Sequence, residues 1–272
     1  MPDPSAPTCA LRGNGGTHPF ARRSLMSQSL AQFAFWLSSP SFPHIEIARG
    51  AGFTAVVLDI EHGTFNLDDL DRVIPFCRAL GIKVYAKVLG PLTEPIQQAL
   101  DFGADAIIIP HIGALDHAKA VTAATKYPPL GVRSYAGGRT MGYGPVDDSF
   151  SANENARTKC WPMIESREAL NDVEAIAALP TVDGLFAGPT DLSMAAGNPR
   201  YSFSESDKND IARIGAAARA AGKPWVLPAW TAPERAFGKL HRADITVVGA
   251  QYALIRSAFH GLVDSLGSEG LL

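Results

Sequence analysis

The sequence predicts an α/β protein of the (β/α)8 TIM-barrel class. Short apolar runs alternate eight times with longer amphipathic segments along the 272-residue chain, a length that suits one such barrel of about 250 residues. The apolar runs are continuous and rich in Val, Ile and Phe, as expected of parallel strands covered on both faces. The eight expected strands are Phe33–Leu37, Ala55–Asp59, Lys83–Val88, Asp105–Pro110, Cys160–Ile164, Asp183–Ala187, Lys223–Leu227 and Asp244–Val248.

The segments between these strands have the pattern of amphipathic helices with recognisable ends. Gly52, Gly81, Gly103 and Gly222 each follow a helical pattern, and Pro180 follows another, and these residue types are common stop signals. The expected helices are Phe42–Ala51, Leu67–Leu80, Pro95–Phe102, Ala114–Lys126, Ser166–Leu179, Ser206–Ala221, Pro233–Leu240 and Gln251–Leu262.

The chain is expected to divide into a disordered arm, residues 1–30, and a single barrel domain, residues 31–272. The arm is rich in Pro, Gly and Ser, and its Gly13–Gly16 stretch does not stand between a strand and a helix. An open, doubly wound sheet is the alternative arrangement, but no GxGxxG follows the first strand, which disfavours dinucleotide binding.

Composition excludes several classes of function. The formal net charge is −3 with no long basic stretch, so no nucleic-acid partner is expected. No run of 18 apolar residues is present, so no membrane span is expected. The three cysteines, Cys9, Cys77 and Cys160, are scattered without a CxxC pair, which fits a reducing compartment and predicts a cytoplasmic protein.

Ionisable residues collect at the carboxyl ends of the expected strands, where barrel enzymes carry their active sites. Asp59 and His62 follow the second strand, Lys87 ends the third, Glu165 follows the fifth and Asp191 follows the sixth. Two carboxylates with no intervening arginine suit a hard divalent cation such as Mg²⁺ or Mn²⁺. His62 fits either a further ligand or a general base.

Each of these residues also has a purely structural interpretation. Asp59 could cap the following turn, and Glu165 and Asp191 could stabilise the helices that they precede. His111 and His44 are expected to be structural. The Gly-rich stretch Gly131–Gly144 is too long for a plain connection, and a substrate-covering role is plausible for it.

Several motifs in the same order resemble the HpcH/HpaI family of class II, metal-dependent pyruvate aldolases. The resemblance spans about residues 33 to 260. The motifs are Glu46-Ile-Ala-Arg-Gly-Ala-Gly-Phe53, Leu58-Asp-Ile-Glu-His-Gly63, Ala99-Leu-Asp-Phe-Gly-Ala-Asp105, Lys126-Tyr-Pro-Pro-Leu-Gly-Val-Arg133, Met163-Ile-Glu-Ser166 and Gly188-Pro-Thr-Asp-Leu-Ser193.

The resemblance implies roles for individual residues. Glu165 and Asp191 match the ligands of a Mg²⁺, Mn²⁺ or Co²⁺ ion, and His62 matches the catalytic base. Asp101 matches the acid that raises the basicity of this histidine, and Asp59 looks like a carboxylate near the metal-bound waters. Gly188 and Thr190 stand where the family binds the keto acid. The resemblance also implies a homohexamer, a trimer of dimers in which neighbouring subunits exchange a terminal helix.

Two positions depart from the family pattern. Lys87, fourteen residues before Asp101, stands where the family has arginine, and Met163 replaces a glutamine. Lysine keeps the charge but loses the planar fork that binds two oxygens, and methionine removes a hydrogen-bond partner. Lys87 also raises the possibility of Schiff-base catalysis.

The resemblance therefore implies a carbon–carbon lyase that converts a 4-hydroxy-2-keto acid to pyruvate and an aldehyde. In this chemistry a metal ion stabilises the enolate, a cation on the third strand stabilises the same developing charge, and His62 moves the proton of the aldol hydroxyl. The alternatives are a condensation of oxaloacetate with an acyl-CoA, as in citrate synthases of this type, and a weakened barrel with a binding role.

Overall fold

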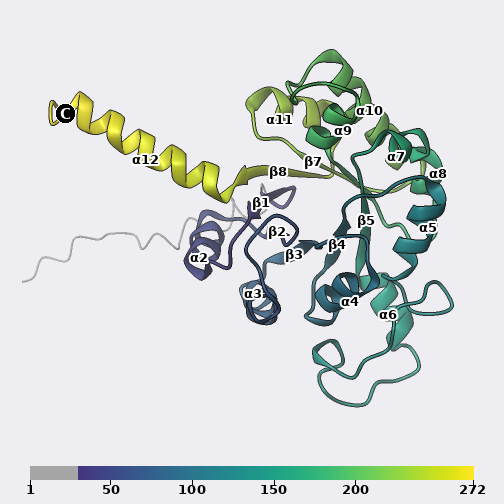
Figure 1. Cartoon of the computed structure of the whole chain (residues 1–272). Helices are drawn as coiled ribbons and strands as arrows, with labels where there is room; N and C mark the ends of the chain where they lie inside the picture. The colour runs from purple at the N-terminus through teal and green to yellow at the C-terminus, as the bar shows by residue number, and fades with distance from the viewer. Residues whose placement is uncertain (1–29) are drawn as a thin grey trace, which may run out of the picture.

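The computed structural model describes residues 30–272 and forms a closed barrel of eight parallel strands. Each strand pairs with its neighbours in chain order, and β8 closes the barrel against β1 (Figure 1). The predicted barrel is thus confirmed, and the expected arm at residues 1–30 lies almost wholly outside the described residues. The strands are β1 (Phe33–Leu37), β2 (Ala55–Asp59), β3 (Lys83–Lys87), β4 (Ala106–Ile109), β5 (Lys159–Ile164), β6 (Leu185–Ala187), β7 (Trp225–Pro228) and β8 (Ile245–Ala250).

The helices before α12 lie around the barrel, and the described chain has more helices than the sequence pattern predicts. The expected helix Ser166–Leu179 is two short helices that meet at Asp172, and further helices follow the Gly-rich loop and β6. The helices are α2 (Phe42–Ala51), α3 (Leu67–Ala79), α4 (Thr93–Asp101), α5 (Leu115–Ala123), α6 (Phe150–Arg157), α7 (Arg167–Asn171), α8 (Val173–Ala178), α9 (Pro189–Ala195), α10 (Glu205–Ala220), α11 (Ala232–Leu240) and α12 (Gln251–Ser268), with a 3-10 turn at Arg139–Met141.

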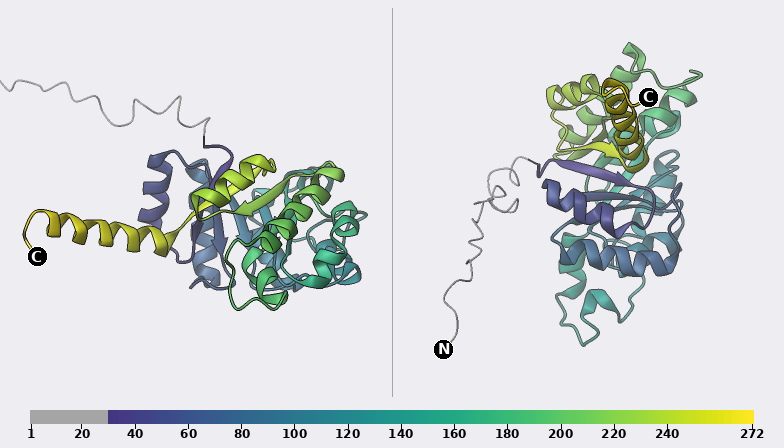
Figure 2. Two further views of the ribbon diagram at one scale, coloured as in Figure 1. Left: turned by 90° about the horizontal axis from the view of Figure 1, so that it is seen from above. Right: turned by 90° about the vertical axis from the view of Figure 1, so that its left-hand side faces the viewer.

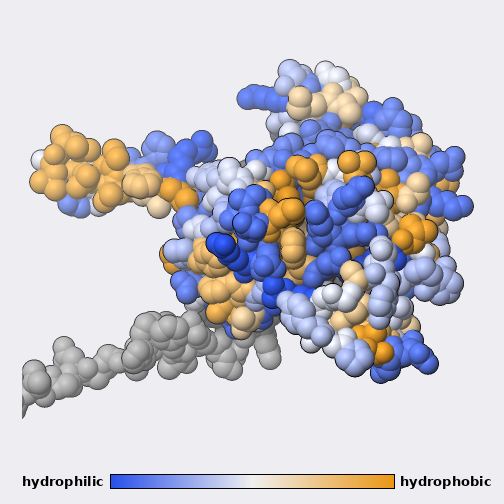
Figure 3. Space-filling model, turned by 60° about the horizontal axis from the view of Figure 1, so that its bottom comes forward, coloured by the Kyte–Doolittle hydropathy of each residue, from blue (hydrophilic) through white to orange (hydrophobic). Residues whose placement is uncertain are grey.

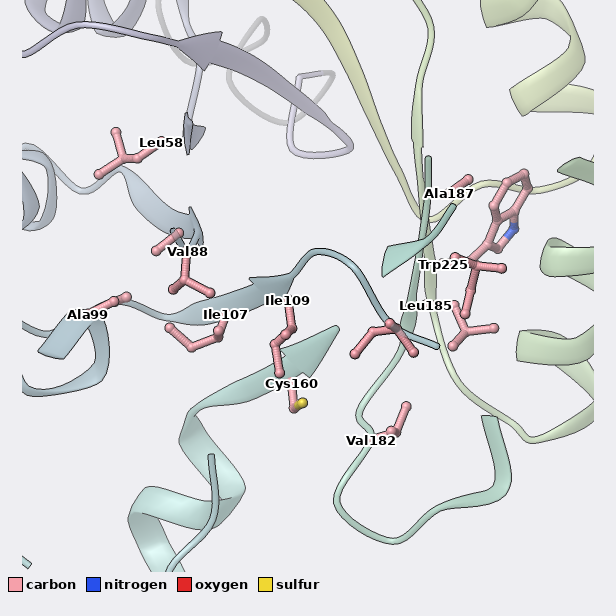
Figure 4. Packing of buried hydrophobic residues seen from close by; sticks show 14 of the residues in the cluster. Leu58, Val88, Ala99, Ile107, Ile109, Cys160, Val182, Leu185, Ala187 and Trp225 are labelled. Atoms are coloured by element: carbon pink, nitrogen blue, oxygen red, sulfur yellow. The ribbon is translucent and has the colours of Figure 1, made fainter. Parts of the chain in front are cut away.

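Two apolar layers hold the barrel together. Alternate strand residues such as Val57, Tyr85 and Trp161 fill the interior, and the intervening residues, such as Leu58 and Ile107, pack outward against the helices (Figure 4). This division follows from the two-residue period of a strand. The alternation also decides which polar side chains point into the barrel at its two ends.

The C-terminal helix α12 does not cover the barrel. It continues from β8 and extends away from the other helices (Figures 1 and 2), and the space-filling view shows apolar side chains along this protruding segment (Figure 3). Leu254, Phe259, Leu262 and Val263 of α12 are all more than half exposed. None of the described helices is long and apolar enough to cross a membrane.

Candidate active site

Neighbouring strands bring Asp59 and Lys87 together at the carboxyl-end rim of the barrel. The two residues are paired in the β2–β3 register, and both side chains are buried. The Lys87 Nζ atom lies 3.4 Å from Asp59 Oδ1. A buried ammonium requires an anionic partner, so the position of Lys87 depends on the carboxylates around it.

Glu61 is the centre of a charged network at this rim. Its carboxylate forms an ion pair with Lys87 and contacts the Nε2 atoms of His111 at 2.5 Å and of His62 at 3.4 Å. Burial raises the pKa of Glu61, but the hydrogen bond and charge of Lys87, together with the nearby His62 and His111, outweigh burial and hold the pKa below its ordinary value. Glu61 is therefore an anion that orients three proton-bearing side chains.

A tight turn presents His62 to solvent beside this network. The His62 N–H donates to Asp59 Oδ1 at 3.3 Å, and the Gly63 N–H donates to the Asp59 carbonyl at 2.9 Å. A Cβ atom on Gly63 would lie 2.2 Å from that carbonyl oxygen, so the turn requires glycine. The His62 side chain is 67% exposed, which leaves its ring accessible at the mouth of the site.

His111 connects the network to Glu165 across the rim. Its backbone has a φ of 56°, in the left-handed region that non-glycine residues rarely adopt. In this conformation the His111 N–H donates to Glu165 Oε1 at 2.6 Å, while its ring reaches Glu61. Backbone strain of this kind concentrates at functional sites, and here it aligns two carboxylates from different strands.

Glu165 and Asp191 form a carboxylate pair that fits a divalent cation. Burial raises the pKa of Glu165, the N–H of His111 opposes this rise, and the negative charge of Asp191 adds to it. A bound cation would relieve both the burial cost and the repulsion. A Cβ atom on Gly188 would lie 2.6 Å from Glu165 Cβ and 3.1 Å from its Oε2, so glycine keeps this carboxylate accessible. Within residues 30–272, no group of three or more His, Cys, Asp or Glu side chains has metal-binding geometry.

Aromatic side chains line the barrel beneath and beside these charges. The Trp36 Nε1 atom donates to Asp59 Oδ2 at 3.1 Å, and Lys87 Nζ lies 5.8 Å from the Trp36 ring centroid. Trp36 also makes an edge contact with the half-exposed Trp230 at 6.0 Å between centroids. Met163 is buried in the interior cluster, and its Cε atom would be 2.9 Å from a Cβ on Gly188. The charged rim is therefore backed by aromatic and apolar side chains.

The structure brings most of the predicted site residues to one rim but leaves Asp101 elsewhere. Thr190 and Asp191 lie exposed in the first turn of α9. Asp101 ends α4, which runs about 13 Å away from the rim, and its carboxylate accepts a hydrogen bond from Arg133 Nη2 at 2.7 Å. Among the described residues no contact joins Asp101 to His62.

Three residues of the site are absent from the sequence-based set. Glu61 stands in the quoted motif without a role, His111 is expected to be structural, and Trp36 is not singled out. Their positions in the sequence could have identified them, because each lies at or just beyond the carboxyl end of a strand. Their mutual contacts depend on the closed barrel and have no local sequence pattern.

Comparison with known proteins identifies the family. The model of the HpcH/HpaI aldolase/citrate lyase family matches residues 32–243. The chain is 32% identical to a 2-keto-3-deoxy-L-rhamnonate aldolase from Klebsiella pneumoniae, over 89% of this chain and 90% of that protein. It is also 32% identical to a 5-keto-4-deoxy-D-glucarate aldolase from Shigella sonnei, over 93% of this chain and 98% of that protein. The chain belongs to the HpcH/HpaI aldolase/citrate lyase family.

Solved structures agree with this assignment at the level of the fold. An HpcH/HpaI aldolase from Desulfitobacterium hafniense superimposes with a TM-score of 0.81 at 20% identity, covering 89% of this chain and 94% of that one. A citrate lyase β subunit from M. tuberculosis, in complex with oxaloacetate and magnesium, gives a TM-score of 0.51 at 13% identity, covering 82% and 92%. This HpcH/HpaI protein is thus a carbon–carbon lyase of the class II pyruvate aldolase type.

Proposed function

We propose that this aldolase cleaves 4-hydroxy-2-keto acids to pyruvate and an aldehyde at the rim formed by Asp59, Glu61, Lys87, Glu165 and Asp191. The observation that carries the proposal is the buried carboxylate of Glu165, which faces the charge of Asp191. Among residues 30–272 no lysine or arginine pairs with it, and the nearest ring nitrogen is His111 Nδ1 at 3.5 Å. The two relatives are named for deoxy-keto sugar acids, and this supports a polyhydroxylated substrate of that class.

Glu165 and Asp191 would hold the divalent cation, for which Mg²⁺ is our first choice and Mn²⁺ or Co²⁺ are alternatives. Oxygen-only ligation suits such hard ions. When bound, the cation would supply Lewis-acid stabilisation of the charge that develops on the keto oxygen.

Lys87 would add a second positive charge beside the reacting oxygen. Asp59 and Glu61 both lie against its ammonium group, an environment that suits a cation, whereas a Schiff base requires a neutral amine. We therefore assign Lys87 an electrostatic role and not a covalent one. The exposed ring of His62 would accept the proton of the substrate's 4-hydroxyl group, with Glu61 holding the ring in place.

The remaining predicted residues would bind the keto acid. The backbone around Thr190 at the start of α9 would receive its carboxylate, with Gly188 allowing close approach. Met163 lines the same space with an apolar side chain, so it offers shape and no strong hydrogen bond.

We further propose a homohexamer, a trimer of dimers, in which α12 packs on a neighbouring subunit. The first turns of α12 border an apolar groove with Phe35, Ile47 and Phe53, and its outer half is exposed and apolar. In this assembly Asp101, far from His62 of its own chain, would act on His62 of another copy. Replacing Phe259 and Leu262 by aspartate should then yield smaller species in analytical ultracentrifugation, and an unchanged sedimentation coefficient would contradict the helix exchange.

The cytoplasm remains our expected location. The described cysteines, Cys77 and Cys160, are buried free thiols, which are typical of a reducing compartment.

The direct test of the function is pyruvate release from 4-hydroxy-2-keto acids, coupled to lactate dehydrogenase, before and after EDTA treatment. We expect turnover that EDTA abolishes and added Mg²⁺ or Mn²⁺ restores. Turnover that survives EDTA would refute the metal mechanism. If pyruvate is not released but oxaloacetate and an acyl-CoA are consumed together, the enzyme condenses instead of cleaving.

A further inference from the structure

A second cavity lies at the opposite end of the barrel from the active site. It has a volume of about 500 Å³ and is lined by residues at the amino ends of β3, β4 and β5 and just before β6 and β7. The lining residues that matter here are Lys83, Tyr85, Asp105, Arg157, Lys159 and Trp161. This volume falls in the range of small-molecule sites, roughly 300–1,000 Å³.

Strand alternation directs two lysines into this mouth. Tyr85 and Trp161 belong to the interior cluster and contact each other edge to face at 4.8 Å between centroids. Lys83 and Lys159 each precede one of these residues by two positions, so they share its inward orientation. The cavity thus has an aromatic floor and a cationic opening.

The carboxylates beside the cavity are already engaged. Asp105 Oδ2 accepts the Val84 N–H at 2.8 Å, and Asp183 Oδ2 accepts the Cys160 N–H at 2.8 Å. Asp183 also pairs with the buried Lys126 at 2.7 Å and, more loosely, with Lys159 at 4.0 Å. Asp105 Oδ1 lies 3.6 Å from Arg157 Nη1.

Lys83 makes no ion pair with any residue in the part of the chain that the structure describes. The cavity lining holds three cationic side chains, Lys83, Arg157 and Lys159, and two carboxylates, Asp105 and Asp183. The opening therefore has a small excess of positive charge, although the whole chain carries a formal net charge of −3.

Two donors on the lining residues also lack acceptors. Trp161 Nε1 and Arg157 Nη1 are buried and have no hydrogen-bond partner within residues 30–272. Arg157 donates from Nε and Nη2 to Glu154, and its Nη1 lies 3.6 Å from Asp105 Oδ1, beyond hydrogen-bond distance. Buried donors without partners are rare and call for an explanation. A ligand that brings oxygen acceptors to this end of the barrel would explain them, because it would accept hydrogen bonds from these donors.

We propose that the amino-end mouth of the barrel binds a small organic anion. Its phosphate or carboxylate group lies between Lys83, Lys159 and Arg157, and its apolar body packs on Tyr85 and Trp161. This anion site is separate from the lyase centre and does not depend on the metal.

The test uses the full chain in EDTA, so that metal-dependent binding at the active site does not contribute. The probes are phenyl phosphate, benzoate and inorganic phosphate, with benzyl alcohol as the neutral counterpart. Affinity is measured by calorimetry, and position by the indole N–H signals of the four tryptophans in ¹H–¹⁵N spectra, with Trp161→Phe identifying the Trp161 signal.

We expect the Trp161 signal to shift with phenyl phosphate, and the Kd to rise at least tenfold in the Lys83→Ala Lys159→Ala variant. Lys119→Ala Lys239→Ala is the matched control, because both lysines are exposed on helices far from the cavity lining; its Kd should change less than twofold. Comparison of phenyl phosphate with benzoate then shows which anionic group the site prefers.

Three results would overturn the proposal. The first is an unchanged Kd in the Lys83→Ala Lys159→Ala variant. The second is a shift confined to the Trp36 and Trp230 signals at the other end of the barrel. The third is that none of the anions binds more tightly than benzyl alcohol.

Discussion

The two ends of this barrel place their carboxylates in different surroundings. At the amino end, Asp105, Asp183 and Asp244 accept hydrogen bonds from the backbone N–H groups of Val84, Cys160 and Trp225, respectively, and so join the starts of adjacent strands. At the carboxyl-end rim, Asp59 and Glu165 also accept a backbone N–H each, but together with Glu61 they gather around the side chains of Lys87, His62 and His111.

This difference indicates that the amino-end carboxylates stabilise the fold and the rim carboxylates take part in the reaction. A carboxylate that joins the starts of adjacent strands fixes the barrel, because each bond ties one strand to the next. A carboxylate at the rim sits near other charges that it does not fully neutralise, and such groups are available for a cation or a substrate. Substitutions at the two ends should therefore affect different measurements.

The largest effect is expected from Glu165→Gln at the rim. Loss of the buried charge should weaken cation binding and lower kcat/KM by about 10³-fold or more, while thermal stability stays close to that of the wild type. Pyruvate release at saturating Mg²⁺ checks this. Glu174→Gln, an exposed member of an ion pair with Arg213, is the control and should retain full activity.

Asp183→Ala at the amino end should lower thermal stability and leave the activity nearly unchanged. It leaves the buried Lys126 ammonium without its anion and the Cys160 N–H without an acceptor, which should cost about 3 kcal/mol in unfolding free energy. The expected decrease in Tm is roughly 6–12 °C, with kcat nearly unchanged at temperatures where the variant is folded. Asp71→Ala, which removes an exposed partner of Arg139, should lower Tm far less, and equal losses would remove the distinction between the two ends.

Lys87 tests whether the rim needs a charge or a particular amine. Lys87→Met should lower kcat/KM by about 10²-fold, whereas Lys87→Arg should leave the activity unchanged or raise it, because arginine keeps the charge and adds a second donor. Steady-state kinetics with one 4-hydroxy-2-keto acid compares them. A large loss in Lys87→Arg, or a substrate adduct trapped on Lys87 by borohydride, would show that lysine has a role of its own.

The smallest effect concerns the buried thiols. Burial raises the pKa of Cys77 and of Cys160 to about 12, so iodoacetamide at pH 8 should leave both unmodified in the native protein and alkylate both in guanidinium. Peptide mass spectrometry measures this. The native pKa exceeds the ordinary thiol value of 9.0, so the contribution of these thiols to stability is complete below pH 9 and is lost as the pH rises towards 12. Rapid native labelling of Cys160 would contradict its burial.

The sequence predicts the barrel well because its signals are local. Each strand is a continuous apolar run, and the predicted β1 and β2 match the structure at both ends. The hydrophobic pattern of α12 does not give its direction, because an apolar face looks the same whether it covers its own barrel or another subunit. Only the family resemblance implied that a terminal helix is exchanged. The division of the expected Ser166–Leu179 helix at Asp172 arises from tertiary contact, since Asp172 accepts the Leu115 N–H at 2.8 Å.

The candidate site is predictable only in part, for the same reason. Glu165 and Asp191 follow from the rule that reactive residues end barrel strands. The link from Lys87 through Glu61 to His111 requires contacts across 26 and 50 positions of the chain, and the left-handed backbone of His111 that completes it has no sequence signature. Asp101 has the right motif but lies at the wrong end of the barrel for its own His62, so the role that we propose for it requires a second copy.

The central claim is that the acidic rim holds a divalent cation through Glu165 and Asp191. Calorimetric titration of EDTA-treated protein with Mn²⁺, in the presence of pyruvate, tests it most directly in the wild type and in Glu165→Gln, Asp191→Asn and Asp105→Asn. The account predicts one Mn²⁺ per chain in the wild type and in Asp105→Asn, and no measurable binding in the two rim variants. Wild-type affinity in both rim variants would contradict it.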